Sequence, residues 1–490
     1  MKINLPKDVK FILDTLILKG YDSYIVGGCV RDTLLWVDPK DWDICTSATP
    51  EEVLDIFSDH RIIETGLKHG TVTIVLNDVG YEITTFRVDG EYKDNRRPEE
   101  VTYTSDIIAD LSRRDLTINS MAYNDIKGLI DPFEGRKDLE NKMIRCVGDA
   151  NERFNEDALR ILRAIRFASR LRFDIAFPTA WAIYRHKALL KNISVERIMS
   201  EFDKILMFEC ATNHANQLFK MHSAGVLRYV IPELYDDLNY DIERHIDILS
   251  KVKKQDMKMA ILLSEMSLEQ AEKVLSRLRY PNKFKDAVLC LLKNKDINIS
   301  MEHLAVKCWL RRLGVDMFKK ILLFKNAMGI IPQYHLEGIS MQLNDILENK
   351  EIYLMKDLAI NGDDLISLGF RDGKMIGHLL EELLRYAMNS TNMKINTKPK
   401  LIECLTRWLY LIPCEDLLWR DKSGFHHKIS EMDTKHIKNI QKAFKRDKKI
   451  IASKKNKETL FSDEFYEENR DRYWEEVFRC ELLRRSWIFD

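Results

Sequence analysis

Two aspartates separated by one residue are the first candidates for chemistry. Asp41 and Asp43 flank Trp42 in a short run that predicts a β-strand, and a spacing of two places both carboxylates on one strand face. Hard carboxylate oxygens suit Mg²⁺, which keeps its other positions for water and phosphate. A lone pair of this kind is more often only exposed acids, so its interpretation depends on the neighbouring motifs.

A glycine turn precedes the aspartates. Ile25-Val26 leads into Gly27-Gly28-Cys29-Val30-Arg31-Asp32, a pattern of strand, turn and helix start. Glycines let backbone N–H groups approach phosphate oxygens, and Arg31 adds charge-assisted hydrogen bonds. The segment predicts a triphosphate site, although a Gly-Gly turn without such neighbours is usually only a turn.

Two further motifs carry suitable groups. Glu82 lies in a predicted strand over Tyr81–Arg87, where it is either a solvent-facing acid or a third carboxylate for an attacking hydroxyl or a second ion. Arg113-Arg114-Asp115-Leu116-Thr117-Ile118-Asn119 is either a solvated helix start or a set of ribose and phosphate contacts, since guanidinium groups bind phosphate oxygens in pairs.

Residues 153–168 contain a possible base-reading pair. The pattern predicts one helix over Glu156–Leu171 with Asn155 as its N-cap, and places Asp157 beside Arg160 on the surface. An acceptor beside donors matches the Watson–Crick edges of cytosine and adenine and mismatches those of uracil and guanine. Alternatively, the acids answer the helix dipole and Arg160, Arg163 and Arg166 form a solvated stripe.

The elements that must position these groups change in character along the chain. Residues 21–135 alternate turn signals with short strand-like runs, two of them joined as a hairpin by Asn77-Asp78-Val79-Gly80 and followed by a mobile loop at 90–100. After about residue 137 the pattern is helical, for example in Val195–Phe208, Leu268–Leu278 and Ile376–Tyr386. The predicted class is α+β, with a small mixed sheet followed by a long helical region.

Composition excludes several classes of protein. The 490 residues contain 77 Lys or Arg and 77 Asp or Glu, so a nucleic-acid surface must come from local clusters of charge. The nine cysteines form no C-x-x-C pair, which argues against a zinc ribbon or a secreted disulfide framework. No run is long enough to predict a membrane span, and we expect a cytoplasmic protein.

Taken together, the motifs resemble those of class II CCA-adding enzymes and bacterial poly(A) polymerases, within the polymerase-beta nucleotidyltransferase superfamily. The matching pieces include GGCVRD at 27–32, DWD at 41–43, YEITTFRV at 81–88, RRDLTIN at 113–119 and RFNEDALRILRAIRFASRL at 153–171. They occur in the family's order. A later segment, 361–384, resembles the tRNA-binding tail of CCA-adding enzymes.

The resemblance implies a site and a set of ligands. Asp41 and Asp43 would bind two Mg²⁺ ions, with Glu82 as the third carboxylate, and CTP or ATP would contact Gly27, Gly28, Arg31, Arg114, Asp115, Asn119, Asp157, Arg160, Arg163 and Arg166. The other partner would be tRNA with an absent or incomplete 3′ CCA. No membrane partner is expected, and the sequence indicates no oligomeric state.

The resemblance also implies four parts of the chain. They are a nucleotidyltransferase head at 1–137, a neck with the nucleotide-selecting helix at 138–200, a tRNA-binding body and tail at 201–410, and an accessory module of unknown function at 413–490. The expected reaction is the addition of C, C and A with release of pyrophosphate. The alternatives are a poly(A) polymerase, an enzyme adding only CC or only A, and a catalytically inactive RNA-binding protein.

Overall fold

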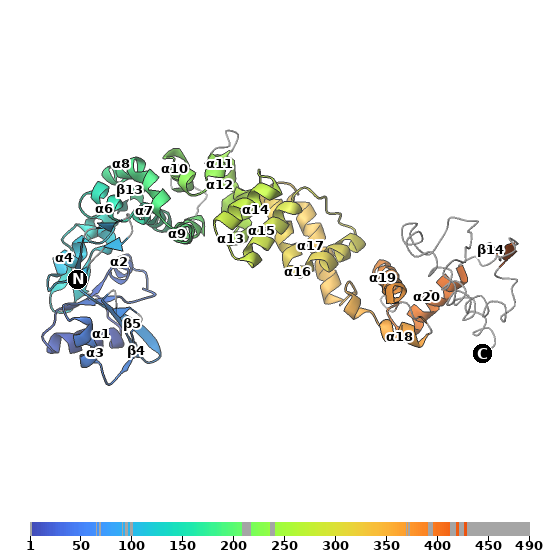
Figure 1. The fold of residues 1–490 in the computed structure, drawn as a ribbon, viewed down its shortest axis with the longest axis horizontal. Helices are drawn as coiled ribbons and strands as arrows, with labels where there is room; N and C mark the ends of the chain where they lie inside the picture. The colour runs from blue at the N-terminus through green and yellow to red at the C-terminus, as the bar shows by residue number, and fades with distance from the viewer. Residues whose placement is uncertain are drawn as a thin grey trace. The chain divides into compact units, whose positions relative to one another are not determined.

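A computed structural model describes residues 2–428 (Figure 1), except 65, 68–69, 91, 94–96, 99–100, 208–216, 236–240, 369, 371–372, 391–394, 412–417 and 421–425. The described part divides into two compact units. Unit 1 comprises Met1–Ile297 and Lys320–Ile331, and unit 2 comprises Asn298–Lys319 and the chain from Pro332 onward. All the predicted site residues belong to unit 1.

The N-terminal part of unit 1 is built on a seven-stranded sheet of order β11-β10-β1-β2-β5-β4-β3. Strands β2 and β5 are parallel and the other neighbours are antiparallel, so the sheet is mixed, as predicted. The strands are β1 (Ser23–Val26), β2 (Ile44–Thr46), β3 (Arg61–Ile63), β4 (Thr71–Leu76), β5 (Val79–Thr85), β10 (Ala122–Asn124) and β11 (Gly128–Ile130).

Short helices and strand pairs complete this part. Helices α1 (Lys7–Leu18) and α3 (Pro50–Ile56) lie beside β4 and β5 in Figure 1. The remaining elements are α2 (Gly28–Leu34), α4 (Ile107–Ser112), the 3-10 turn η2 (Thr117–Asn119), α5 (Gly135–Glu140), and the paired strands β6 (Arg87–Asp89) with β9 (Val101–Tyr103) and β12 (Met143–Ile144) with β13 (Asp174–Ile175).

The β4–β5 hairpin was predicted at the right place with too long a turn. Leu76 pairs with Val79, so only Asn77 and Asp78 connect the strands. Their φ angles are 48° and 62°, and two positive φ angles are what a two-residue turn matched to the twist of the strands requires. The predicted strand ends earlier as well, because β5 stops at Thr85 and β6 begins at Arg87.

A buried cluster fixes α4 to the sheet. Tyr24, Phe86 and Leu111 are fully buried, and the rings of Tyr24 and Phe86 stack with centroids 6.1 Å apart. Burial of such side chains removes a large apolar area from water. The cluster therefore holds the arginines that follow α4 in a constant position relative to β1 and β2.

Helices dominate the chain after β12, which confirms the predicted α+β class. In unit 1 they are α6 (Ala150–Glu156), α7 (Leu159–Leu171), α8 (Phe177–His186), α9 (Val195–Met207), α10 (Gln217–Ser223), α11 (Pro232–Tyr235), α12 (Ile242–Ser250), α13 (Gln255–Leu262), α14 (Leu268–Arg277) and α15 (Asn282–Lys293), with the 3-10 turns η3 (Lys187–Asn192) and η5 (Leu227–Tyr229).

Unit 2 contains α17 (Gln333–Glu348), η6 (Met355–Asp357), α18 (Gly362–Ser367), α19 (Gly373–Asn389) and α20 (Lys398–Leu411). Helix α16 (His303–Ala327) belongs to unit 2 up to Lys319 and to unit 1 from Lys320, and it includes a non-helical Gly314. None of the described helices is long and apolar enough to cross a membrane.

Two predicted segments fall largely on residues outside this description. In the expected loop at 90–100, Tyr92–Lys93 (β7) pairs with Arg97–Pro98 (β8), and 91, 94–96 and 99–100 lie outside the described residues. In the expected accessory module, Leu418–Arg420 (β14) pairs with His426–Lys428 (β15), and the rest of 413–490 lies outside them.

Candidate active site

Most of the predicted site residues line one cavity of about 440 Å³ in unit 1. Its wall is formed by the β1–α2 turn and the start of α2, the segment before β2, the residues after α4, and one face of α7 together with Asp157 before it. The predicted residues that line it are Gly27, Gly28, Arg31, Asp41, Asp43, Arg114, Asp115, Asn119, Asp157, Arg160 and Arg163.

Gly27 lets the backbone come close to two charged side chains. Its φ is 78°, a left-handed value that favours glycine. A Cβ at this position would stand 3.3 Å from Nη1 of Arg114 and 4.0 Å from Oδ2 of Asp43. The glycine turn is therefore a close packing point as well as the start of α2.

The two aspartates precede β2 instead of lying within it. We predicted a strand from Asp41, but β2 begins at Ile44 because its partner β1 ends at Val26, where Gly27 turns the chain into α2. The last pairing bond runs from Val26 N–H to the carbonyl of Asp43, at 2.9 Å. Both carboxylates nevertheless reach the cavity, so the prediction was wrong about the element and correct about the grouping.

Burial and neighbouring carboxylates raise the pKa of Asp43. Burial is the largest cause of a raised pKa at Asp43, and the charges of Glu82 and Asp41 add to it, while Arg114 acts in the opposite direction. Repulsion of this kind is relieved by a bound cation. Among the described residues no group of three His, Cys, Asp or Glu could hold a metal by itself. The two carboxylates that line the cavity offer the hard oxygens that Mg²⁺ prefers alongside water and phosphate.

A buried aspartate holds the two arginines that follow α4. Asp110 accepts hydrogen bonds from Arg113 Nη2 at 2.7 Å and from Arg114 Nη2 at 3.1 Å. Burial alone would raise the pKa of Asp110, but Arg114 and Arg113 outweigh it and lower the pKa. Arg114 lines the cavity, and its Nε is buried without a hydrogen-bond partner among the described residues.

Two other guanidinium groups are already engaged by the protein. Asp115 Oδ2 accepts from Arg163 Nε at 2.7 Å, and Asn119 Oδ1 accepts from Arg31 Nη1 at 2.6 Å. Arg31 also donates from Nε to Asp32 at 2.8 Å. Each guanidinium has five N–H donors, so these bonds orient Arg31 and Arg163 and leave further donors for a phosphate.

The helix predicted over Glu156–Leu171 is interrupted. Helix α6 ends at Glu156 and α7 starts at Leu159, so Asn155 lies in the last turn of α6 and is not an N-cap. Asp157 has φ −136° and ψ 103°, and its Oδ1 accepts from Leu159 N–H at 3.1 Å. The carboxylate that we placed on a helix surface therefore satisfies the start of the next helix.

Different partners hold Asp157 and Arg160 in the cavity wall. Oδ2 of Asp157 accepts from Arg197 Nη2 of α9 at 2.9 Å. Arg160 donates from Nη1 to Glu156 at 2.6 Å and from Nη2 to the carbonyl oxygen of Arg113 at 2.9 Å. The two side chains line one cavity with fixed orientations, as recognition of a base edge requires.

Glu82 and Arg166 are the predicted residues that do not line the cavity. Glu82 is exposed on β5 opposite Thr73, although its charge reaches Asp43. Arg166 makes an ion pair of 2.6 Å with Glu201 of α9, and its guanidinium lies 4.3 Å from the ring centroid of Phe167. In this structure Arg166 connects α7 to α9.

Sequence reasoning assigned no site role to four cavity-lining residues: Asp32, Lys40, Phe167 and Arg170. Arg113, which was considered with Arg114 as a phosphate contact, also lines the cavity. Lys40 could have been found from its position next to Asp41. Phe167 and Arg170 follow Arg163 by four and seven residues, so extending the same helix face would have included them. The Phe167 ring has the guanidinium of Arg31 at 5.0 Å and that of Arg163 at 5.8 Å, a cation–π arrangement.

Comparison with known sequence families covers most of the chain. The Poly A polymerase head domain matches residues 23–145, an RNA- and SrmB-binding region of polymerase A matches 172–238, and domain 2 of tRNA nucleotidyltransferases matches 250–403. The three matches follow one another without overlap.

Individual relatives agree with these matches. The chain is 34% identical to a CCA-adding enzyme of Ligilactobacillus salivarius over 82% of this chain and 98% of the relative, and 33% identical to one of Levilactobacillus brevis over 82% and 99%. The Bacillus stearothermophilus CCA-adding enzyme in complex with CTP superposes with a TM-score of 0.67 at 29% identity, over 83% and 99% of the two chains.

A CCA-adding enzyme of Thermotoga maritima, solved with tRNA, shares the fold with a TM-score of 0.60 at 22% identity, over 82% and 96% of the two chains. The relatives thus span almost their whole length on this chain, and the motifs that carry the resemblance converge on one cavity. The chain belongs to the family of CCA-adding enzymes.

Proposed function

We propose that this chain adds C, C and A to the 3′ end of tRNA from CTP and ATP, with release of pyrophosphate. The observation that carries the proposal is the single cavity that joins Asp41 and Asp43 to the guanidinium groups and to the Asp157–Arg160 pair. The carboxylates, through bound cations, and the guanidinium groups suit a reacting triphosphate, and the Asp157–Arg160 pair suits a base. CTP and tRNA are also the ligands named for solved relatives.

The family implies a divalent cation, and we propose two Mg²⁺ ions held by Asp41 and Asp43. Such ions supply charge neutralisation on the α-phosphate and on the leaving pyrophosphate, and lower the pKa of the attacking 3′-hydroxyl. The residues of the chain bring hard oxygens to this place, where burial and neighbouring acids raise the pKa of Asp43. Glu82 is proposed as an outer carboxylate that increases the negative field.

The triphosphate would lie along Gly27, Gly28, Arg31, Arg114, Asn119 and Arg163. Arg114 lines the cavity, and its position is fixed by Asp110. Arg31 and Arg163 keep part of their donors on Asp32, Asn119 and Asp115, so they are oriented before the nucleotide arrives. Prior orientation reduces the reorganisation needed during the reaction.

Base choice is proposed to rest on Asp157 as acceptor and Arg160 as donor. Cytosine and adenine share an amino group beside a ring-nitrogen acceptor, which this pair can satisfy. Uracil and guanine would leave polar groups unmatched, at about 1–3 kcal/mol for each group. The protein thereby replaces a nucleic-acid template, and the segment at 90–100 is proposed to adjust the pocket between C and A.

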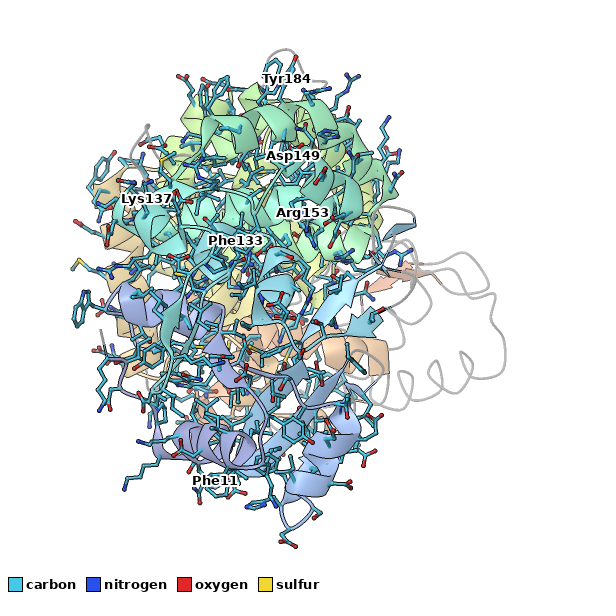
Figure 2. The ribbon with its side chains drawn as sticks, turned by 90° about the vertical axis from the view of Figure 1, so that its left-hand side faces the viewer. Phe11, Phe133, Lys137, Asp149, Arg153 and Tyr184 are labelled. Carbon is cyan, nitrogen blue, oxygen red and sulfur yellow. The ribbon has the colours of Figure 1, made fainter. Side chains whose placement is uncertain are left out.

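A basic and aromatic surface supports RNA as the other substrate. No Asp or Glu occurs between Asp174 and Glu196. On α8, Trp181 and Tyr184 are half exposed with ring centroids 5.8 Å apart, and Lys187 Nζ lies 3.8 Å from the Tyr184 centroid. Figure 2 shows Tyr184 at the outer edge of the ribbon. Such surfaces bind RNA through phosphate charge and base stacking.

The division into a head at 1–137, a neck at 138–200, a body and tail at 201–410 and an accessory module at 413–490 is retained as part of the proposal, as is a place of action in the cytoplasm. A poly(A) polymerase and an enzyme adding only CC or only A remain the competing activities.

One incubation separates these activities. The protein is mixed with tRNA ending before CCA and with CTP and ATP, separately and together, and the products are sequenced. CCA ends are expected with both nucleotides. A long A tract would support a poly(A) polymerase, and absence of CTP use would leave A addition. Asp43→Ala is the matched inactive variant, which should lose incorporation and retain tRNA binding.

A further inference from the structure

Trp36 is an exposed aromatic residue on the connection from α2 to Asp41. Its side chain is 91% exposed, and the adjacent Val37 is 52% exposed. Large apolar side chains in such positions often mark contacts with another molecule. The mechanism derived above gives this residue no role.

The backbone at Trp36 is one that ordinarily favours glycine. Helix α2 ends with Leu35 as its C-cap, and Trp36 follows with φ 61°. Trp36 N–H donates to Thr33 O at 3.0 Å, and Val37 N–H donates to Asp32 O at 2.9 Å. This is the hydrogen-bond pattern of a Schellman cap, in which the left-handed position is usually Gly. A tryptophan is strained there and gains no burial in return.

The strained turn adjoins the wall of the active-site cavity. Asp32, whose carbonyl accepts from Val37, lines the cavity, and so does Lys40, four residues after Trp36. Four residues span at most about 14 Å. The exposed indole is therefore carried by a hydrogen-bonded turn whose backbone lies within about 14 Å of Lys40 in the cavity wall.

We propose that Trp36 is a positioning residue on which an unpaired base near the reacting 3′ end of the RNA stacks. The inference rests on the proposed function. Base–aromatic stacking does not depend on base identity, which suits a strand whose terminal residue changes with each addition. RNA is favoured over a protein partner because Lys40, four residues after Trp36, lines a cavity that also carries several guanidinium groups, whose charges complement phosphate.

Three substitutions separate stacking from backbone effects. Trp36→Gly and Trp36→Asn remove the ring and tolerate the left-handed φ, and Trp36→Phe keeps an aromatic face. Leu18→Ala is the control, since Leu18 is 87% exposed at the end of α1 and lies outside the cavity wall. KM for tRNA ending before CCA, KM for CTP at saturating tRNA, kcat and the melting temperature are measured for each.

We expect Trp36→Gly and Trp36→Asn to raise the tRNA KM by about 5- to 150-fold, the range of one lost base stack. The CTP KM should change less than twofold, and the melting temperature should stay the same or rise, because the strained φ is relieved. Trp36→Phe should recover most of the tRNA affinity, and Leu18→Ala should match the wild type.

An unchanged tRNA KM in Trp36→Gly would overturn the inference, and unchanged RNA kinetics together with loss of a protein partner would indicate a protein contact instead. A fall in melting temperature with equal losses for all substrates would assign Trp36 a role in folding. Failure of the wild-type protein to add any nucleotide would refute the proposed function itself, so the two failures are distinguishable.

Discussion

Arg197→Met tests whether base choice depends on a residue outside the cavity wall. Arg197 of α9 donates to Oδ2 of Asp157 at 2.9 Å, while Oδ1 accepts from Leu159 N–H at 3.1 Å. The substitution removes the first bond and keeps the second. Methionine retains most of the side-chain length without the charge, so Asp157 gains freedom to rotate about the remaining bond.

The expected loss follows from the exposure of the pair. A hydrogen bond between charged groups contributes about 1.5–3 kcal/mol when buried. The Arg197 and Asp157 side chains are 29% and 16% exposed, so solvent screening reduces the value to about 1–1.5 kcal/mol. That corresponds to about a 5- to 12-fold loss of kcat/KM for CTP. Uracil lacks the amino group that donates to Asp157, so kcat/KM for UTP should fall less.

Single-nucleotide incorporation into tRNA ending before CCA gives kcat/KM for CTP and UTP separately. Arg279→Met is the control, because Arg279 makes an exposed ion pair with Glu196, which lies on α9 next to Arg197. Arg197→Met should reduce the CTP preference, and Arg279→Met should preserve it. The reasoning fails if the CTP/UTP ratio stays within twofold in Arg197→Met, or if both variants change it equally.

Three other substitutions test the site. Gly27→Ala should lower kcat/KM for CTP and ATP alike and lower the melting temperature by a few degrees. Its Cβ would meet Arg114, and the left-handed φ costs an alanine about 1–2 kcal/mol. Gly128→Ala is the control, because Gly128 also has a left-handed φ of 74° but its Cβ would meet open space, so this variant should show the backbone strain alone. Asp115→Asn should reduce stability at pH 7 by about 1–3 kcal/mol. Burial raises the pKa of Asp115, but the charge and hydrogen bond of Arg163 outweigh it, so the pKa is lowered. The stability that the ionised Asp115 contributes is therefore lost as the pH falls through this lowered pKa. The difference in melting temperature between Asp115→Asn and the wild type should accordingly shrink in a series from pH 7 to 3. Arg170→Met should raise the nucleotide KM about 3- to 10-fold with kcat unchanged, unlike Arg172→Met outside the cavity; equal KM values in these two variants would remove Arg170 from the site.

Short-range patterns predicted four of the seven strands of the described sheet, with errors at the ends of β2 and β5, and most of the residues that share the cavity. Thr71–Leu76 is a strand as predicted, because β-branched residues between turn signals favour that state locally. The glycine turn and the acid pair, found from the sequence alone, both line the cavity. Such features depend on residues that are near each other along the chain.

Features set by distant partners were not predictable in this way. The helical spacing of apolar residues continues through Asp157, so the sequence predicts one helix. In the structure, however, the Asp157 carboxylate accepts from the N–H of Leu159 at the start of α7 and from Arg197, forty residues away. Arg166 has the same spacing as Arg160 and Arg163 but is engaged by Glu201. The start of β2 at Ile44 depends on where β1 ends, which spacing within the DWD motif does not reveal.

The bond from Arg160 to the carbonyl oxygen of Arg113 has a consequence for how selectivity can be inherited. Its acceptor belongs to the main chain, so almost any side chain at 113 would preserve it. Point mutation can alter the other anchor, Glu156, but cannot easily delete this one. This main-chain anchor of Arg160 is therefore robust to side-chain substitution at 113, and altered nucleotide preference is more accessible through Glu156 or through displacement of the backbone after α4.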